Sequence, residues 1–160
     1  MKKIVYEAGF LLTYALDKLD KLKFVNPIYG AIKPDNSKIL KEIKEISLEL
    51  SIPKAISLME NNTENAESSV VIYPAELEDS NSNRYNVLII HIEKHNSLNF
   101  MTIAQPYNFK DGAIELTNYE LLDYFELLED ELKELEEEFI QGAYNYDNAE
   151  NIWEDKFVAN

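Results

Sequence analysis

The sequence contains no cysteine in its 160 residues. A disulfide framework, a thiolate nucleophile and a cysteine-based metal site are therefore excluded. Its four glycines are scattered, so none of them belongs to a glycine-rich loop that cradles phosphate groups. No stretch approaches the roughly 18–20 apolar residues of a membrane-spanning helix. We therefore expect a cytoplasmic protein that has no cofactor, no bound metal and no membrane partner.

Positive charge is scarce in the last third of the chain. The formal net charge of the whole chain is −15, and residues 111–160 contain two lysines against sixteen acidic residues. A field of this sign repels nucleic acid and anionic membranes, and it attracts basic proteins. We therefore expect a basic protein partner and no direct contact with nucleic acid.

The composition is typical of a globular chain. Hydrophobic residues make up 46% of it and aromatic residues 11%, which excludes a mainly disordered protein. A length of 160 residues suits one domain that buries a substantial core. We therefore expect residues 1–160 to form a single α+β domain. Its predicted elements are N-terminal helices, a small antiparallel β-meander, a long acidic C-terminal helix and a short helix after it.

Helical periodicity dominates the first sixty residues. A broad apolar stripe begins at Ile4 and ends before Asn26-Pro27, a pair that stops a helix. Turn and capping residues at positions 34–37 precede a second periodic segment. The pattern predicts helices over residues 4–22, 39–50 and 51–60, the last with Pro53 in its first turn, and a small strand over residues 28–32.

The middle of the chain is rich in β-branched and aromatic residues. Val87 to Ile90 is apolar on both faces, so we expect its strand to be central and covered on both sides. Pro74 suits an edge position, because proline cannot donate a backbone hydrogen bond. The segments that we predict as the antiparallel meander are residues 70–73, 85–93 and 98–104.

The longest periodic pattern runs from Thr117 to Gln141 and predicts one helix. Thr117 and Glu120 have the spacing of a capping box, and Gly142 stands where a helix normally ends. Asp147 and Glu150 repeat the capping-box spacing before a short terminal helix. The apolar seam, with alternating steps of four and three residues, consists of Leu121, Phe125, Leu128, Leu132, Leu135 and Phe139.

Acidic residues occupy the outward positions of this predicted helix. Seven of the ten residues from Glu129 to Glu138 are Asp or Glu. Acids in the last turns oppose the helix dipole, and like charges four residues apart repel one another, so they do not serve helix stability. A parallel self-dimer would bring like charges together, which argues against a homodimeric coiled coil. We predict that the seam packs on the protein's own core and that the partner binds Glu129, Glu131, Glu134, Glu136, Glu138, Tyr144 and Tyr146.

The two histidines offer the main catalytic alternative. His91, Glu93 and His95 share one face of a regular strand, and two histidines with one carboxylate can bind iron or zinc. Four residues along a strand span about 13 Å, however, which is too far for one ion to reach both imidazoles without a bend. We therefore assign no metal ligands to this triplet.

These observations favour a non-enzymatic binding protein that neutralises a basic partner through its acidic C-terminal third. Small immunity proteins that occlude nucleic-acid-degrading toxins fit this physical description, which is an analogy of class without a shared motif. Other inhibitors of nucleic-acid enzymes, including mimics of nucleic acid, fit it equally. The alternatives are a small metal-dependent enzyme that uses the histidine triplet, and an adaptor subunit of a larger assembly.

Overall fold

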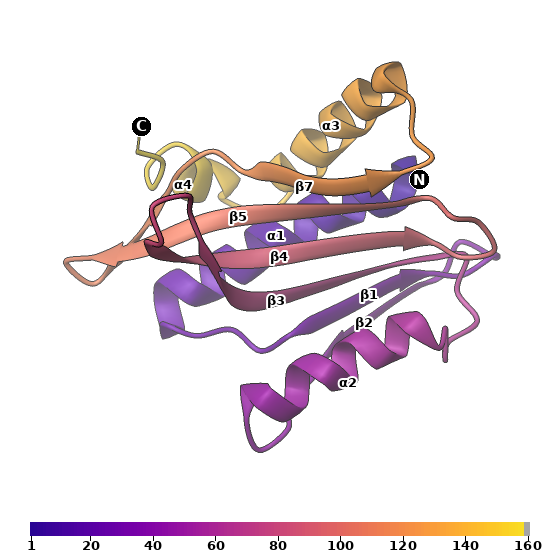
Figure 1. The fold of residues 1–160 in the computed structure, drawn as a ribbon, viewed down its shortest axis with the longest axis horizontal. Coiled ribbons are helices and arrows are strands. Elements are labelled where there is room, and N and C mark those ends of the chain that lie inside the picture. The colour runs from indigo at the N-terminus through magenta and orange to yellow at the C-terminus, as the bar shows by residue number, and fades with distance from the viewer. Residues whose placement is uncertain (159–160) are drawn as a thin grey trace.

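The protein has an α+β fold in which an N-terminal helix and C-terminal helices accompany an antiparallel sheet of seven strands (Figure 1). The structure is a computed structural model that describes residues 1–158. The elements, in chain order, are α1 (Lys2–Leu22), β1 (Ile28–Ile32), β2 (Lys38–Glu42), α2 (Leu48–Glu60), β3 (Ser68–Glu78), β4 (Arg84–Lys94), β5 (Phe100–Lys110), β6 (Ala113–Leu116), β7 (Glu120–Phe125), α3 (Glu129–Tyr144) and α4 (Ala149–Trp153).

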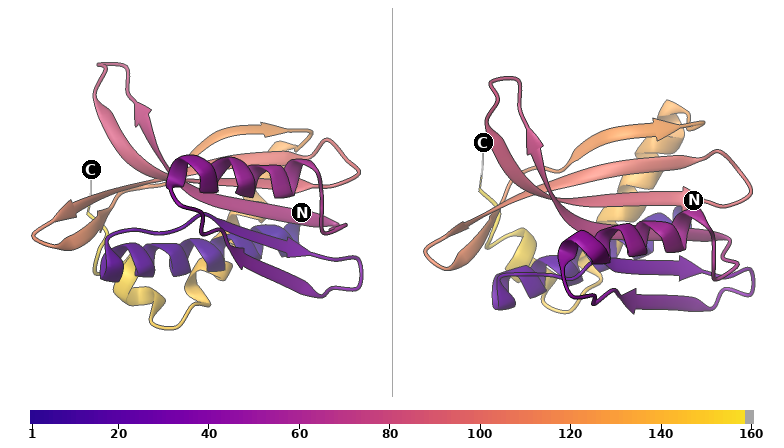
Figure 2. Two further views of the ribbon diagram at one scale, coloured as in Figure 1. Left: turned by 90° about the horizontal axis from the view of Figure 1, so that it is seen from below. Right: turned by 60° about the horizontal axis from the view of Figure 1, so that its bottom comes forward.

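The sheet has the order β2-β1-β3-β4-β5-β6, and every neighbouring pair is antiparallel. The predicted meander is confirmed as β3, β4 and β5, which are each eleven residues long. β7 is an additional strand that pairs with β5 over residues 100–104, whereas β6 pairs with β5 over residues 107–110. The tips of β3 and β4 extend away from the rest of the sheet (Figure 2).

Helices cover both faces of the sheet. α1 passes behind the strands and α2 lies in front of β1 and β3 (Figure 1). The α1 stripe, which the sequence predicts, packs on Val70, Ile72, Leu88 and Ile90 in the main core. On the other face, α2 buries Ala55 and Met59 against β1 and β3. The predicted burial of residues 87–90 on both faces of β4 is confirmed.

Pro74 lies where β3 has one neighbour. β1 pairs with β3 only as far as Ile72, and beyond it β4 is the only strand among residues 1–158 that pairs with β3. The missing amide hydrogen of proline therefore removes no bond from the ladder. The edge position predicted for Pro74 is confirmed, although β3 as a whole is an inner strand.

The predicted helix over residues 39–50 is wrong. Residues 38–42 form β2, which pairs with β1 through a turn closed by a 2.9 Å bond from the Lys33 amide to the Ser37 carbonyl. The helical spacing of its isoleucines is coincidental, since Ile46 is 96% exposed. α2 begins at Leu48 and contains the predicted helix over residues 51–60, so Pro53 lies in its second turn rather than its first.

The predicted helix from Thr117 to Gln141 is wrong in its first half. Residues 120–125 form β7, because their backbone completes the ladder along β5, and Glu126 leaves the strand with a φ of 54°. Glu120 pairs with Ala104, so the capping box of Thr117 and Glu120 does not form. α3 begins only at Glu129, and the seam residues Leu121, Phe125 and Leu128 are exposed, whereas Leu135 and Phe139 are buried.

α1 and α3 touch through their backbones at two glycines. A Cβ atom on Gly9 would lie 2.0 Å from the Phe139 carbonyl oxygen, and one on Gly142 would lie 1.9 Å from the Tyr6 carbonyl oxygen. Gly142 therefore lies inside α3, where it permits this close approach, and it does not end the helix. The buried Thr13 hydroxyl donates a 2.8 Å bond to the Ala143 carbonyl, which adds a polar tie between the two helices.

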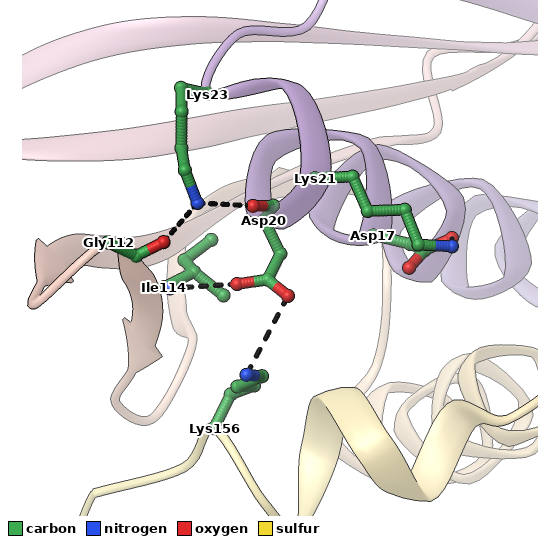
Figure 3. Close-up of polar contacts among 7 residues, drawn as sticks. All are labelled: Asp17, Asp20, Lys21, Lys23, Gly112, Ile114 and Lys156. Carbon is green, nitrogen blue, oxygen red and sulfur yellow. Dashed lines mark hydrogen bonds and ion pairs between the residues drawn. The ribbon is translucent and has the colours of Figure 1, made fainter.

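The C-terminal segment is attached to α1 and β6. α4 is the predicted short helix, but it begins after Asn148, which has a left-handed backbone and no side-chain cap, so the capping box of Asp147 and Glu150 is wrong. Trp153 donates a 2.8 Å bond to the hydroxyl of Thr13. Asp20 accepts a 2.9 Å bond from the Ile114 amide and lies 3.6 Å from the Lys156 ammonium (Figure 3).

We expect Gly142→Ala to destabilise the protein by about 1–3 kcal/mol or more, because the added methyl group must separate two packed backbones. Gln141→Ala, at an exposed position on the same helix, should change the free energy of unfolding by less than about 0.5 kcal/mol. Urea denaturation followed by circular dichroism measures both variants. Equal stabilities would contradict the close helix contact.

We expect Phe139→Ala to destabilise the protein by about 3–5 kcal/mol, because Phe139 is buried in the main core. Leu128→Ala should be nearly neutral, because 71% of the Leu128 side chain is exposed. The same denaturation experiment separates this arrangement from the sequence-based prediction, in which both side chains belong to one buried seam. A large loss of stability in Leu128→Ala would contradict the structure.

Candidate functional site

The outward face of α3 carries the largest concentration of acidic side chains. Leu135, Phe139, Gly142 and Ala143 are buried, whereas the acids of α3 are exposed, apart from the half-buried Glu138. Lys133 is the one basic residue of the helix. We call this surface the α3 acidic face, and its members are Glu129, Asp130, Glu131, Glu134, Glu136, Glu137 and Glu138.

Three residues of the α3 acidic face bond within the protein. Glu134 forms a 2.9 Å ion pair with Lys2 in which both side chains are more than half exposed. Glu136 accepts a 2.6 Å bond from the Tyr119 hydroxyl. Glu131 accepts a 3.1 Å bond from the Leu128 amide, which caps the start of α3.

The other four acids have no such contact. No hydrogen bond or ion pair from residues 1–158 reaches the side chains of Glu129, Asp130, Glu137 or Glu138. Of the five glutamates that the sequence selects for partner binding, Glu129 and Glu138 therefore keep their carboxylates available. The remaining three are partly engaged within the chain.

Because α3 begins at Glu129, its acids lie at different places along the helix dipole from those that the sequence predicts. Glu129, Asp130 and Glu131 lie in the first turn, where the helix dipole favours acids, and Glu138 lies more than one turn before the end at Tyr144. The dipole therefore does not oppose these acids. The repulsion between residues four apart, as in Asp130 and Glu134, is unaffected by this change.

Lys2 shows what the α3 acidic face does to a cation. The bond to Glu134 raises the pKa of the Lys2 ammonium above its usual value, and the charges of Glu138 and Glu137 add to the shift. Since Lys2 is exposed, burial does not hold it there. A cation at this surface therefore interacts favourably with several carboxylates together.

The two selected tyrosines lie at the other end of α3. Tyr144 is 48% exposed. Tyr146 donates a 2.8 Å bond to Asp17, and its ring lies 5.6 Å from that of Phe10 and 6.3 Å from that of Tyr14. Burial and then the bond to Asp17 raise the pKa of the Tyr146 hydroxyl to about 12. Tyr146 thus fastens the end of α3 to α1, and it is separated from Glu129 by the length of the helix.

Sequence reasoning missed an apolar surface beside the α3 acidic face. All six residues of β7 are exposed, and among them are Leu121, Leu122, Tyr124 and Phe125. A cavity of about 190 Å³ separates β7 from α3. Met101, Ile103, Leu121 and Leu132 give it apolar walls, and Glu129, Lys133 and Glu136 also line it. The aromatic pair Tyr124 and Phe125, residue types common in strands, is a weak sequence signal of a strand there.

The histidine triplet is engaged in contacts between strands. His91 lies 2.6 Å from the Thr102 hydroxyl through Nδ1 and 3.0 Å from Glu93 through Nε2. His95 lies in the turn after β4, with Nε2 2.7 Å from the Ser69 hydroxyl. Within residues 1–158, no three His, Cys, Asp or Glu side chains are grouped closely enough to hold a metal ion.

No family model, curated protein or solved structure matches this chain. In the part of the chain that the structure describes, no helix has the length and apolar character needed to cross a membrane. The geometry of the α3 acidic face and of β7 therefore carries the functional interpretation.

We expect stability to fall with acidification partly because of His95. Burial lowers the pKa of its imidazole below the usual value of about 6.5, so the unfolded chain takes up a proton more readily than the folded protein. This contribution to stability is present above pH 6.5 and is lost as the pH falls toward the lowered value. His95→Gln should therefore lose less stability than the wild type between about pH 7.5 and about pH 5.5. Denaturation at both pH values measures this difference, and equal losses would contradict it.

Proposed function

We propose that this chain is a non-enzymatic binding protein that inhibits a basic protein partner through the α3 acidic face. The observation that supports the proposal is the set of Glu129, Asp130, Glu137 and Glu138, whose carboxylates have no partner among residues 1–158. Beyond the first turn, like charges such as Glu134 and Glu138, four residues apart, repel each other and do not stabilise the helix. A partner that supplies cations gives these side chains a role.

The charge density of the face suits a partner that handles nucleic acid. From Glu129 to Glu138 the net charge is −6, and ten helical residues extend about 15 Å. This corresponds to about one charge per 2.5 Å, against one per ~1.7 Å along duplex DNA. A basic surface that binds phosphates would therefore meet a comparable field here. The favoured class of partner is a toxin or an enzyme that acts on nucleic acid, which would make this chain an immunity-type inhibitor.

Charge complementarity would act mainly on the rate of encounter. A concentrated field can raise association rates by about 10–10³-fold, and salt weakens it. The ion pair of Lys2 with Glu134 is an example, within this chain, of the contact that a lysine of the partner would form with the α3 acidic face. An adaptor with the same surface would bind its partner without blocking the partner's activity, so inhibition assays separate the two functions.

We expect the triple variant Glu129→Gln, Glu137→Gln and Glu138→Gln to bind the partner more slowly. The partner would be captured from the native host at low salt, eluted with salt and assayed for inhibition. Association should slow by about tenfold at low salt, because steering charge is lost, and the difference should shrink as salt is added. Stability should change little, because the repulsion relieved at Glu138 is offset by the loss of a first-turn acid that the helix dipole favours at Glu129.

A matched control removes the same charge elsewhere. Glu49, Glu60 and Glu78 are exposed residues of α2 and β3. Their replacement by glutamine should change the association rate far less than the α3 triple variant does. If the two triple variants associate with the partner at the same rate and their folds are intact, net charge alone determines the association rate. The α3 acidic face would then not be the binding site.

A further inference from the structure

Two of the three sheet edges are protected against further pairing. β2 carries Lys38 and Lys41, which pair with Glu7 and Glu64, and charged side chains of this kind discourage edge pairing. At β6 the C-terminal segment covers Leu116: its amide donates a 2.8 Å bond to the Lys156 carbonyl, and its carbonyl accepts one from the Val158 amide.

The third edge is β7, whose two charged side chains, Glu120 and Asp123, are acidic and whose pairing with β5 contains a register shift. Among residues 1–158, β7 pairs only with β5. Its side chains are exposed on both faces, and Leu121, Leu122, Tyr124 and Phe125 are 43–47% exposed. An exposed apolar strand with a free edge is a template for another strand.

The space between β7 and α3 suits the side chains of an added strand. α3 extends past β7 in Figure 1 and in the right-hand view of Figure 2. The cavity of about 190 Å³ between them has apolar walls at Leu121 and Leu132, with Glu129 and Glu136 beside them. Successive side chains of a strand alternate between faces, so every second side chain of the added strand would face α3. Apolar and basic side chains at these positions would match the walls.

Charge selects the occupant of this edge. Both charged residues of β7, Glu120 and Asp123, are acidic, and the α3 acidic face lies next to them. A second copy of this chain paired through β7 would bring like charges together across the new ladder, which destabilises strand pairs. A strand that carries Lys or Arg among apolar residues would instead place opposite charges there.

We propose that the basic partner docks by adding one of its own strands to the free edge of β7. Its apolar side chains cover Leu121 and Leu132, and its basic side chains reach Glu129 and the acids of β7. This inference rests on the proposed function and adds the mode of docking to it. The sheet of the inhibitor is then continuous with a strand of the inhibited protein.

Two peptides of equal charge test strand addition directly. The first is an end-blocked heptapeptide with the sequence Lys-Lys-Val-Val-Lys-Lys-Val, which places both lysine and valine on each face of an added strand. The second has the same sequence with N-methyl groups on its three central backbone nitrogens, which prevents pairing along either edge. The first peptide should bind about tenfold more tightly or better, because the second loses backbone hydrogen bonds but no charge. Amide exchange in residues 120–125 should slow only with the first peptide.

Two variants locate the binding at β7. Leu121→Asn removes apolar contact from the cavity wall and should weaken binding of the first peptide several-fold. Ile46→Asn makes the same kind of change in the segment between β2 and α2, where Ile46 is 96% exposed, and should leave binding unchanged. Circular dichroism would show that both variants remain folded.

Three results would overturn the inference. Equal affinity of the two peptides would show that charge acts without strand pairing, which would leave the proposed function standing. Absence of binding by the first peptide at millimolar concentration would exclude the added strand. A concentration-dependent dimer in sedimentation, abolished by Leu121→Asn, would show that a second copy occupies the edge.

Discussion

The backbone contact between α1 and α3 is the constraint on which the functional surface depends. Gly9 and Gly142 allow the helices to approach so closely that a methyl group at either position would overlap a carbonyl oxygen of the other helix. The Thr13 hydroxyl, bonded to both Ala143 and Trp153, ties α1 to α3 and α4. Because one face of α3 is held against α1 in this way, the helix cannot turn its acids inward. Their exposure thus follows from packing as well as from their hydration.

The contact between α1 and α3 also determines how α3 lies relative to β7 at the edge of the sheet. α3 packs on α1, which itself covers the sheet, whereas β7 is held by backbone bonds to β5. The chain connects β7 to α3 through Glu126, with its φ of 54°, and the buried Leu127. β7 is thus attached to β5 and α3 to α1, and the cavity between β7 and α3 remains open. An apolar edge and an acidic helix lie next to each other for this reason.

Local sequence signals were sufficient to predict an element where the pattern of apolar residues fitted either a helix or a strand but not both. The α1 stripe and the β-branched runs of β3, β4 and β5 have only one interpretation each, and both were predicted correctly. Residues 117–125 satisfied the helical pattern, and the pairing with β5 that overrides it is not local. Glu126 ends the strand without a glycine to signal it. For the candidate site, the sequence predicted that α3 exposes its acids, but the attachment of Tyr146 to Asp17 and the apolar surface of β7 arise from tertiary contacts.

The distribution of cations explains why the α3 acidic face remains unsatisfied. The first sixty residues hold ten lysines and eight acids, and their lysines pair with nearby carboxylates, as Lys18 does with Glu42 and Lys54 with Glu45. The last fifty residues hold only Lys133 and Lys156 against sixteen acids, and Lys156 lies beside Asp20 of α1. Lys2 is the one cation from elsewhere among residues 1–158 that forms an ion pair with α3. Neutralising the remaining carboxylates therefore requires cations from outside the described chain. Dissolved salt supplies cations that take no fixed positions, whereas a strand bound at β7 would hold its cations at fixed positions. Fixed positions are the physical basis for selectivity in the proposed complex.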